Sequence, residues 1–138
     1  EATLARTVDA VIEQLGEGPL VWRYRTEDGL PGKEGSFLVC AFWLVDALLA
    51  LGREQEARER FEALLARAND LGLYPEEMAA DGTFLGNFPQ AFTHLGLVQS
   101  ALLLQLYANG GKEAVRGTHA DRGRRMAGKR GEGRRDGA

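Results

Sequence analysis

The chain has 138 residues, of which 44% are hydrophobic and 27% charged, with a formal net charge of −3. That length allows one domain with a hydrophobic core. The single cysteine, Cys40, excludes a disulfide within the chain, and we expect a cytoplasmic protein. The longest apolar run, Phe37 to Val45, falls short of the roughly 18 residues that a membrane span needs, so we expect no membrane partner.

Charge is unevenly distributed along the sequence. From Gly110 to Ala138 there are nine Lys or Arg residues, four Asp or Glu residues and eight glycines. Such a composition buries too little apolar surface to offset the entropy of ordering. We expect residues 110–138 to be a disordered basic tail and residues 1–109 to be a folded body with a net charge of about −8. An acidic body argues against nucleic acid as a partner and suits a neutral ligand.

Two helices of different character are predicted in the first half. From Thr3 to Leu15 the apolar residues recur at helical spacing along one stripe, so the rest of this helix faces solvent. A short extended piece is predicted at Leu20–Arg25. From Phe37 to Leu51 every residue except Asp46 is apolar, so the second helix has no polar face and must be covered on all sides.

The second half repeats this alternation. A third helix is predicted from Arg53 to Asn69, with one apolar stripe. Its solvent-facing side carries the i,i+4 pairs Glu54–Arg58 and Glu56–Arg60. A fourth helix, from about Phe88 to Tyr107, is again largely apolar. Asn87 is its predicted cap, and Pro89 is tolerated in its first turn.

Alternation of striped and buried helices predicts a ring of helix pairs, with enclosed inner helices and half-exposed outer ones. The connection at Gly52 is short, whereas Gly16–Ser36 and Asp70–Asn87 are long. With antiparallel neighbours, both long connections emerge at the same end, and Glu34 and Glu76 would line one opening.

A tetratricopeptide-like solenoid is the competing helical architecture, because Leu51–Ala57 reads like one of its repeat turns. That family repeats every 34 residues or so. The two buried helices begin at Phe37 and Phe88, much further apart, which disfavours the solenoid.

The connection from Asp70 to Asn87 carries two adjacent carboxylates, Glu76 and Glu77. Its glycines and proline interrupt any helix or strand, so roughly 17 residues are predicted to be irregular, and loops that long usually have a function. Cleaving a glycosidic bond needs two carboxyl groups on opposite sides of the bond, and adjacent side chains cannot do both jobs. An adjacent acidic pair is also common as solvated surface charge, so both interpretations stay open.

Further candidates lie nearer the N-terminus. Glu34, in a glycine-flanked turn, would accept hydrogen bonds from sugar hydroxyls or favour a helix N-terminus. Trp22, Arg23 and Tyr24 suit a sugar ring, or equally the anchoring of an extended segment. His94 is typical of a satisfied hydrogen-bond partner. The sequence has no Cys or His residues at the spacing of zinc ligands, no phosphate-binding glycine loop and no nucleophile elbow. We therefore expect no metal and no cofactor.

Four blocks, in this order, resemble the C-terminal part of the catalytic domain of glycoside hydrolase family 15. That family contains glucoamylases, glucodextranases and bacterial or archaeal trehalases. The resemblance extends from about Trp22 to Leu104, and Gly-Asn-Phe-Pro-Gln-Ala-Phe in the last block is its most distinctive part. The blocks are Asp28–Phe37 (Asp-Gly-Leu-Pro-Gly-Lys-Glu-Gly-Ser-Phe), Phe42–Leu44 (Phe-Trp-Leu), Leu71–Glu77 (Leu-Gly-Leu-Tyr-Pro-Glu-Glu) and Leu85–His94 (Leu-Gly-Asn-Phe-Pro-Gln-Ala-Phe-Thr-His).

The resemblance implies an all-α fold, part of an (α/α)6 barrel, and hydrolysis of α-glucosidic bonds of the trehalose or α-glucan type with inversion. Glu76 matches the family's general base, with Glu77 as the fallback. We hypothesise that Glu34, Arg23 and Tyr24 position the sugar hydroxyls.

The family's general acid lies in a segment that this chain does not contain, so the remainder of the barrel is expected upstream. The expected partner is then a small carbohydrate, and the chain alone is expected to be inactive. The alternatives are a non-catalytic helical interaction module and an inactive truncated fragment.

Overall fold

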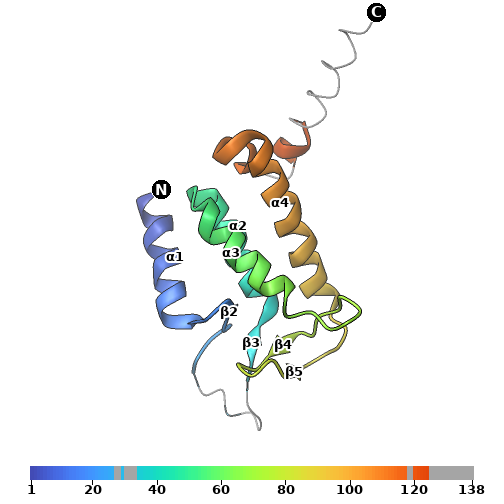
Figure 1. Cartoon of the computed structure of the whole chain (residues 1–138). Helices are drawn as coiled ribbons and strands as arrows, with labels where there is room; N and C mark the ends of the chain where they lie inside the picture. Colours follow the sequence, from blue (N-terminus) through green and yellow to red (C-terminus); the bar gives the residue numbers. More distant parts are fainter. Residues whose placement is uncertain (27–28, 30–33, 118–119, 125–138) are drawn as a thin grey trace, which may run out of the picture.

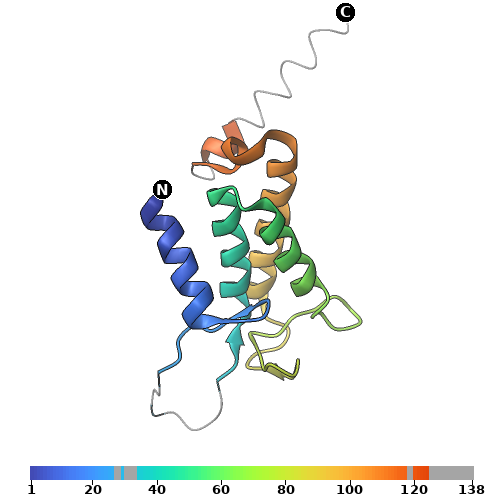
Figure 2. The same ribbon diagram turned by 60° about the vertical axis from the view of Figure 1, so that its left-hand side comes forward.

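The computed structural model describes residues 1–26, 29, 34–117 and 120–124. Most of these residues are helical, which confirms the expected all-α character. Helix α2 lies in the middle, in contact with α1, α3 and α4, and each of the five strands in the described part of the chain has only two residues (Figures 1 and 2). Residues 120–124 are also helical. In chain order the elements are α1 Ala2–Leu15, β1 Gly16–Glu17, β2 Leu20–Val21, β3 Ser36–Phe37, α2 Leu38–Leu51, α3 Glu54–Leu65, β4 Glu77–Met78, β5 Phe84–Leu85 and α4 Ala91–Val115.

Helix α3 is shorter than predicted. It ends at Leu65 and not at Asn69. The side chain of Asn69 accepts hydrogen bonds from the backbone N–H groups of Leu71 and Leu73, at 3.1 and 2.8 Å, and this local turn competes with helix continuation. The ion pairs Glu54–Arg58 and Glu56–Arg60 form as predicted.

Helix α4 is displaced toward the C-terminus relative to the prediction. It begins at Ala91, and Gln90, not Asn87, is its cap. Gln90 has an extended backbone because its N–H donates to the carbonyl of Tyr74 at 3.0 Å, and Pro89, in a cis peptide bond with Phe88, precedes the helix.

The other end of α4 extends past the predicted boundary of the folded body at Asn109. The helix is interrupted at Gly110 and Gly111 and then continues to Val115, which is buried. The predicted tail residues 118–119 and 125–138 lie outside the described residues.

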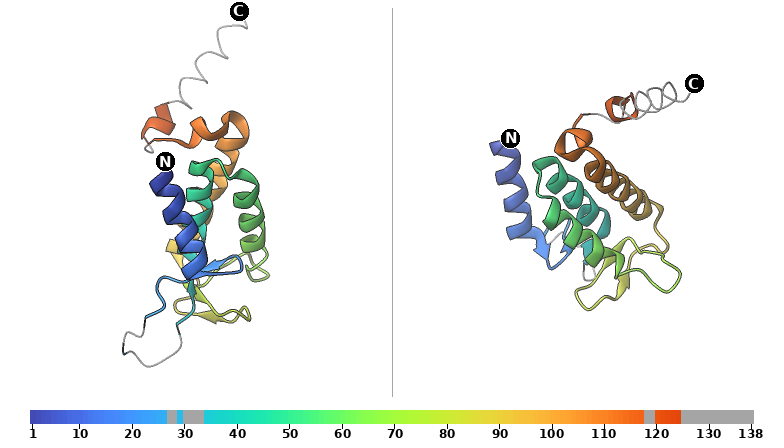
Figure 3. Two further views of the ribbon diagram at one scale, coloured as in Figure 1. Left: turned by 90° about the vertical axis from the view of Figure 1, so that its left-hand side faces the viewer. Right: turned by 45° about the horizontal axis from the view of Figure 1, so that its top comes forward.

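Both long connections emerge at the same end of the helices, as predicted (Figures 1 and 3). Strand β3, from the first connection, pairs antiparallel with β4, from the second. The second connection is not fully irregular, because β4 and β5 form a hairpin within it. Of the extended piece predicted at Leu20–Arg25, only Leu20 and Val21 form a strand.

Helices α2 and α4 pack closely where α4 carries a glycine. A β-carbon at Gly96 would lie 3.2 Å from side-chain atoms of Phe42 and Val39. One turn later, the hydroxyl of buried Ser100 lies 2.6 Å from Oδ1 of Asp46 and 3.1 Å from the carbonyl of Phe42. This contact accounts for the one polar residue of α2.

Helices α2 and α4 are nevertheless not enclosed on all sides within this chain. Their exposed apolar residues, here called the open face, are Trp43 (49% exposed), Phe92 (46%), Leu95 (66%), Val98 (55%) and Leu102 (58%). Of the described helices, α4 alone is long and apolar enough to cross a membrane, a test that the core helices of globular proteins also pass. Within the described residues, these two apolar helices are therefore only partly covered.

Candidate active site

The loop from Tyr74 to Glu76 is held against the first turn of α4. The N–H of Tyr74 donates to Nε2 of His94 at 3.3 Å, and Thr93 donates its hydroxyl proton to the carbonyl of Pro75 at 3.0 Å. The Nδ1 atom of His94 lies 2.7 Å from the carbonyl of Gln90. One nitrogen of the ring accepts, so the other donates, and His94 is a satisfied structural partner, as predicted.

Glu76 is clamped through both its backbone and its side chain. Its N–H donates to the carbonyl of Asn87 at 2.9 Å, and its carbonyl accepts from the N–H of Leu38 at 3.1 Å. Oε2 of its carboxylate accepts two hydrogen bonds from Asn87, from the backbone N at 3.1 Å and from Nδ2 at 2.8 Å. Within the described part of the chain Oε1 accepts none, so one oxygen is fixed and the other is free.

Glu77 has different surroundings from its neighbour. It lies in β4, where successive side chains point to opposite faces, and its Oε2 accepts from the N–H of Gly35 at 3.2 Å. Gly35 belongs to the first long connection and Glu77 to the second. Glu77 therefore ties the two connections together.

Arg23, Tyr24 and Glu34 form one cluster in the first connection. Oε1 of Glu34 accepts from the Arg23 guanidinium at 3.0 Å and from the Tyr24 hydroxyl at 2.9 Å. The hydrogen bond with Tyr24 raises the pKa of Arg23, and the charges of Glu34 and Glu77 raise it further. The other oxygen of Glu34, Oε2, is buried and has no hydrogen-bond partner among the described residues. The predicted sugar-binding residues are thus in contact with one another.

Trp22 is not part of this cluster. Its indole N–H donates to Glu17 at 2.9 Å, and the guanidinium of Arg25 lies 5.3 Å from the centre of its ring. Of the two interpretations of Trp22, the structure favours the anchoring of an extended segment, because Glu17 lies in the neighbouring strand β1.

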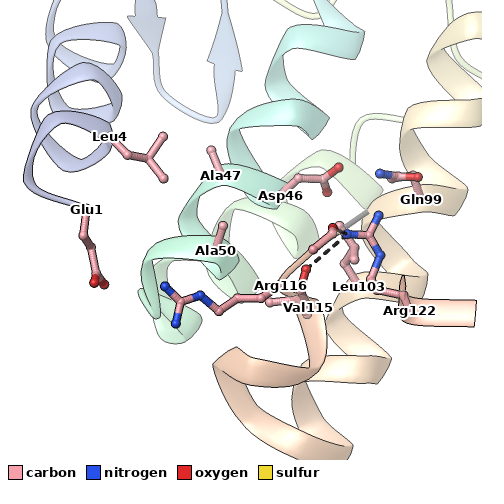
Figure 4. A pocket seen from close by; sticks show the side chains of 11 residues that line it. Glu1, Leu4, Asp46, Ala47, Ala50, Gln99, Leu103, Val115, Arg116 and Arg122 are labelled. Carbon is pink, nitrogen blue, oxygen red and sulfur yellow. Dashed lines mark hydrogen bonds between the residues drawn. The ribbon is translucent and has the colours of Figure 1, made fainter. Parts of the chain in front are cut away.

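A cavity of about 510 Å³ lies away from these residues. It is formed by the N-terminal turn of α1, by α2 and by the C-terminal part of α4, and Glu1, Asp46, Arg116 and Arg122 are among its lining residues (Figure 4). None of the predicted site residues lines it. Within the described ranges, no group of three or more His, Cys, Asp or Glu side chains is placed to hold a metal ion.

The sequence reasoning missed one residue of this site, Asn87, which it assigned to a helix cap. The signal was present, because Asn87 lies in the most distinctive block of the family resemblance. Local sequence could not indicate that its amide reaches a carboxylate 11 residues earlier.

Comparisons with known proteins agree on one family. The model of the family described as "Glycosyl hydrolases family 15" matches residues 3–102. A trehalase of Mycolicibacterium smegmatis is 49% identical over 100 residues, which cover 70% of this chain and 15% of that protein. A trehalase of Thermoplasma volcanium is 49% identical over 94 residues, covering 67% of this chain and 15% of that protein.

A more distant relative matches a segment of similar length. Trehalase 1 of Sulfolobus acidocaldarius is 28% identical over 94 residues, covering 67% of this chain and 17% of that protein. The chain thus spans about 15% of the length of the trehalases it resembles most among these. No solved structure matches it.

Proposed function

The chain belongs to glycosyl hydrolase family 15, and from that membership we propose that it is the part of a glycosidase that supplies the general base. Glu76 is that base. The substrate is an α-glucoside, and trehalose is preferred to maltooligosaccharides because the relatives named above are trehalases.

The single observation that carries this assignment is the unequal use of the two oxygens of Glu76. Asn87 occupies Oε2, and Oε1 is left to a water molecule. In the reaction, Oε1 takes a proton from that water while the water oxygen forms a bond to the anomeric carbon. The bond from that carbon to the leaving oxygen breaks, and the leaving oxygen takes a proton from the general acid.

Inversion requires that the acid and the base stand roughly 6.5–9.5 Å apart, which leaves room for the water. Glu77 is less suited to the role of base, because its Oε2 is engaged with Gly35 and ties two connections together. The general acid belongs to a part of the protein outside this chain, in keeping with the small share of its relatives that the chain spans.

Glu34, Arg23 and Tyr24 bind sugar hydroxyl groups in this proposal. Oε2 of Glu34, which has no partner among the residues that the structure describes, is the acceptor for a hydroxyl proton, since a buried carboxylate oxygen is costly to leave without a donor. Arg23, 43% exposed at its side chain, remains accessible to donate.

The open face of α2 and α4 is covered, in this proposal, by further helices of the same domain, which complete an (α/α)6 barrel. Its five residues are apolar, and the four that lie on α4 recur along one side of that helix, as at a helix–helix interface. Trp43 and Phe92 already touch edge to face, with ring centres 5.6 Å apart. The same face is the observation that favours the second candidate function, a helical interaction module without catalysis.

The test is glucose release by the complete enzyme that contains this chain, on trehalose and on maltose, with the anomers followed by proton NMR. Inverting cleavage of trehalose yields one α-glucose and one β-glucose at first, whereas retention yields only the α anomer. We expect equal amounts of both anomers, and no glucose from the 138-residue chain alone. Absence of activity on both sugars in the complete protein would favour the interaction module.

A further inference from the structure

The β4–β5 hairpin changes its register beside Glu76. Glu77 pairs with Leu85 and Met78 with Phe84, and the hydrogen bond from Ala79 to Thr83 continues that register toward the turn. In the same register Glu76 would face Gly86. Its N–H donates instead to the carbonyl of Asn87, so Gly86 is one extra residue in the segment that directly follows β5.

Such a one-residue bulge redirects the side chains that follow it, and bulges are frequent beside active sites. Gly86 has a φ of +68°, a left-handed conformation that favours glycine. Asn87 comes next, and the bulge aims both its backbone N–H and its amide at the same carboxylate oxygen.

We propose that Asn87, presented by the bulge at Gly86, is a positioning residue that fixes the rotation of the Glu76 carboxylate, an inference that rests on the proposed function of Glu76. Two donors on Oε2, at 3.1 and 2.8 Å, hold the carboxylate plane and leave Oε1 for the attacking water. Hydrogen bonds to a charged carboxylate are stronger than those between neutral groups. The amide, which makes the shorter of the two, therefore contributes much of the restraint on the carboxylate.

The backbone hydrogen bonds of Glu76 do not depend on the side chain of Asn87, so a substitution there tests the position of the carboxylate without unfolding the hairpin. The N–H and carbonyl of Glu76 stay bonded to Asn87 and Leu38 through main-chain atoms, whatever side chain stands at position 87. Removing the amide therefore takes away one of the two donors to Oε2 and loosens the carboxylate, while the backbone N–H of residue 87 still donates to it and the hairpin stays paired. Asn87 is exposed, so its side chain contributes little to the core.

The experiment measures kcat and KM for trehalose hydrolysis by the complete enzyme with Asn87→Ala and Asn87→Asp. Asn87→Asp keeps the shape of the side chain but replaces the donor by a second negative charge. The matched control is Asp81→Ala, which removes a side chain that accepts a 2.9 Å hydrogen bond at the turn of the same hairpin. We expect kcat to fall by up to about 10²-fold in Asn87→Ala and further in Asn87→Asp, with KM and the melting temperature close to those of the control.

A kcat of Asn87→Ala within twofold or so of the control, or a loss confined to KM, would overturn the inference. Should Asn87→Ala fail to fold, Asn87→Asp decides by the same criterion. Glu76→Gln, measured alongside, distinguishes a failure of the proposed base from a failure of the proposed role of Asn87. If Glu76→Gln stays active, the proposed base is wrong. If it is inactive while Asn87→Ala and Asn87→Asp behave like the control, only the role of Asn87 is wrong.

Discussion

A β-carbon at Gly86 would lie 3.0 Å from the β-carbon of Glu76 and 3.0 Å from its Oε2. So tight a contact would force Glu76 to shift by a few tenths of an ångström, and the positive φ of Gly86 independently favours glycine. Glu76 and the bulge are therefore packed against each other.

Gly86→Ala is expected to lower the turnover of the complete enzyme. The control is Gly82→Ala in the same hairpin, because Gly82 also has a positive φ, +89°, but a β-carbon there would meet nothing within 4 Å. Both variants carry a backbone strain of about 1–2 kcal/mol. Melting temperatures should fall in both variants, and further in Gly86→Ala because of its contact with Glu76, whereas kcat should fall only in Gly86→Ala. Equal kcat in the two variants would show that contact with Glu76 does not matter.

Glu34→Gln is expected to raise KM without a comparable loss of stability. The Arg23–Glu34 pair is substantially exposed, and such pairs contribute about 0–1 kcal/mol to folding, so an effect on KM reports on the sugar. Glu54→Gln, which removes a similarly exposed ion pair with Arg58 on α3, is the control. Steady-state kinetics on trehalose make the comparison, and an unchanged KM in Glu34→Gln would remove the residue from the binding site.

His94→Phe is expected to destabilise the loop before Glu76. Phenylalanine retains the edge contact with the ring of Tyr74 but leaves the N–H of Tyr74 without its partner, whereas the carbonyl of Gln90 still accepts from the backbone N–H of residue 94. Each unsatisfied group costs about 1–3 kcal/mol when buried, so the melting temperature should drop measurably. A melting temperature equal to that of the unsubstituted enzyme would argue that His94 does not support the loop.

Cys40 is expected to react slowly with iodoacetamide in the folded protein. Burial raises the pKa of its thiol, an effect that the positive charge of Arg23 opposes, and the thiolate is the reactive form. A raised pKa in the folded state favours folding below the unfolded pKa, and that contribution is lost as pH rises through the folded value. Mass spectrometry of the Cys40 peptide at mildly alkaline pH should show faster labelling in urea. Equal rates in both states would contradict the expected burial.

Sequence periodicity predicted the helices because each depends on its own apolar pattern. Asp46, the single polar residue of the second helix, needed a partner that the sequence did not identify, and Ser100 on α4 provides it. The helix ends were less predictable. Asn69 ends α3, and Gln90 begins α4, through hydrogen bonds to the connection between them.

For the candidate site, too, the sequence identified a residue but not its contacts with distant segments. A carboxylate pair in a long glycine-interrupted connection, together with the family resemblance, was enough to select Glu76. The hairpin register was not accessible, because a bulge at Gly86 depends on strand pairing, so Asn87 was assigned to a cap. The meeting of both long connections at one end followed from the lengths of the connections and the antiparallel order of neighbouring helices, and the pairing of β3 with β4 confirms it.

Turnover of trehalose by Glu76→Gln, compared with Glu77→Gln in the complete enzyme, tests the central assignment most directly. Gln retains the size of either side chain but cannot take a proton from water. We expect Glu76→Gln to lose about 10²–10⁴-fold in kcat at an unchanged melting temperature, and Glu77→Gln to lose much less. Near-normal turnover by Glu76→Gln, or a larger loss in Glu77→Gln, would contradict the assignment of Glu76 as the general base.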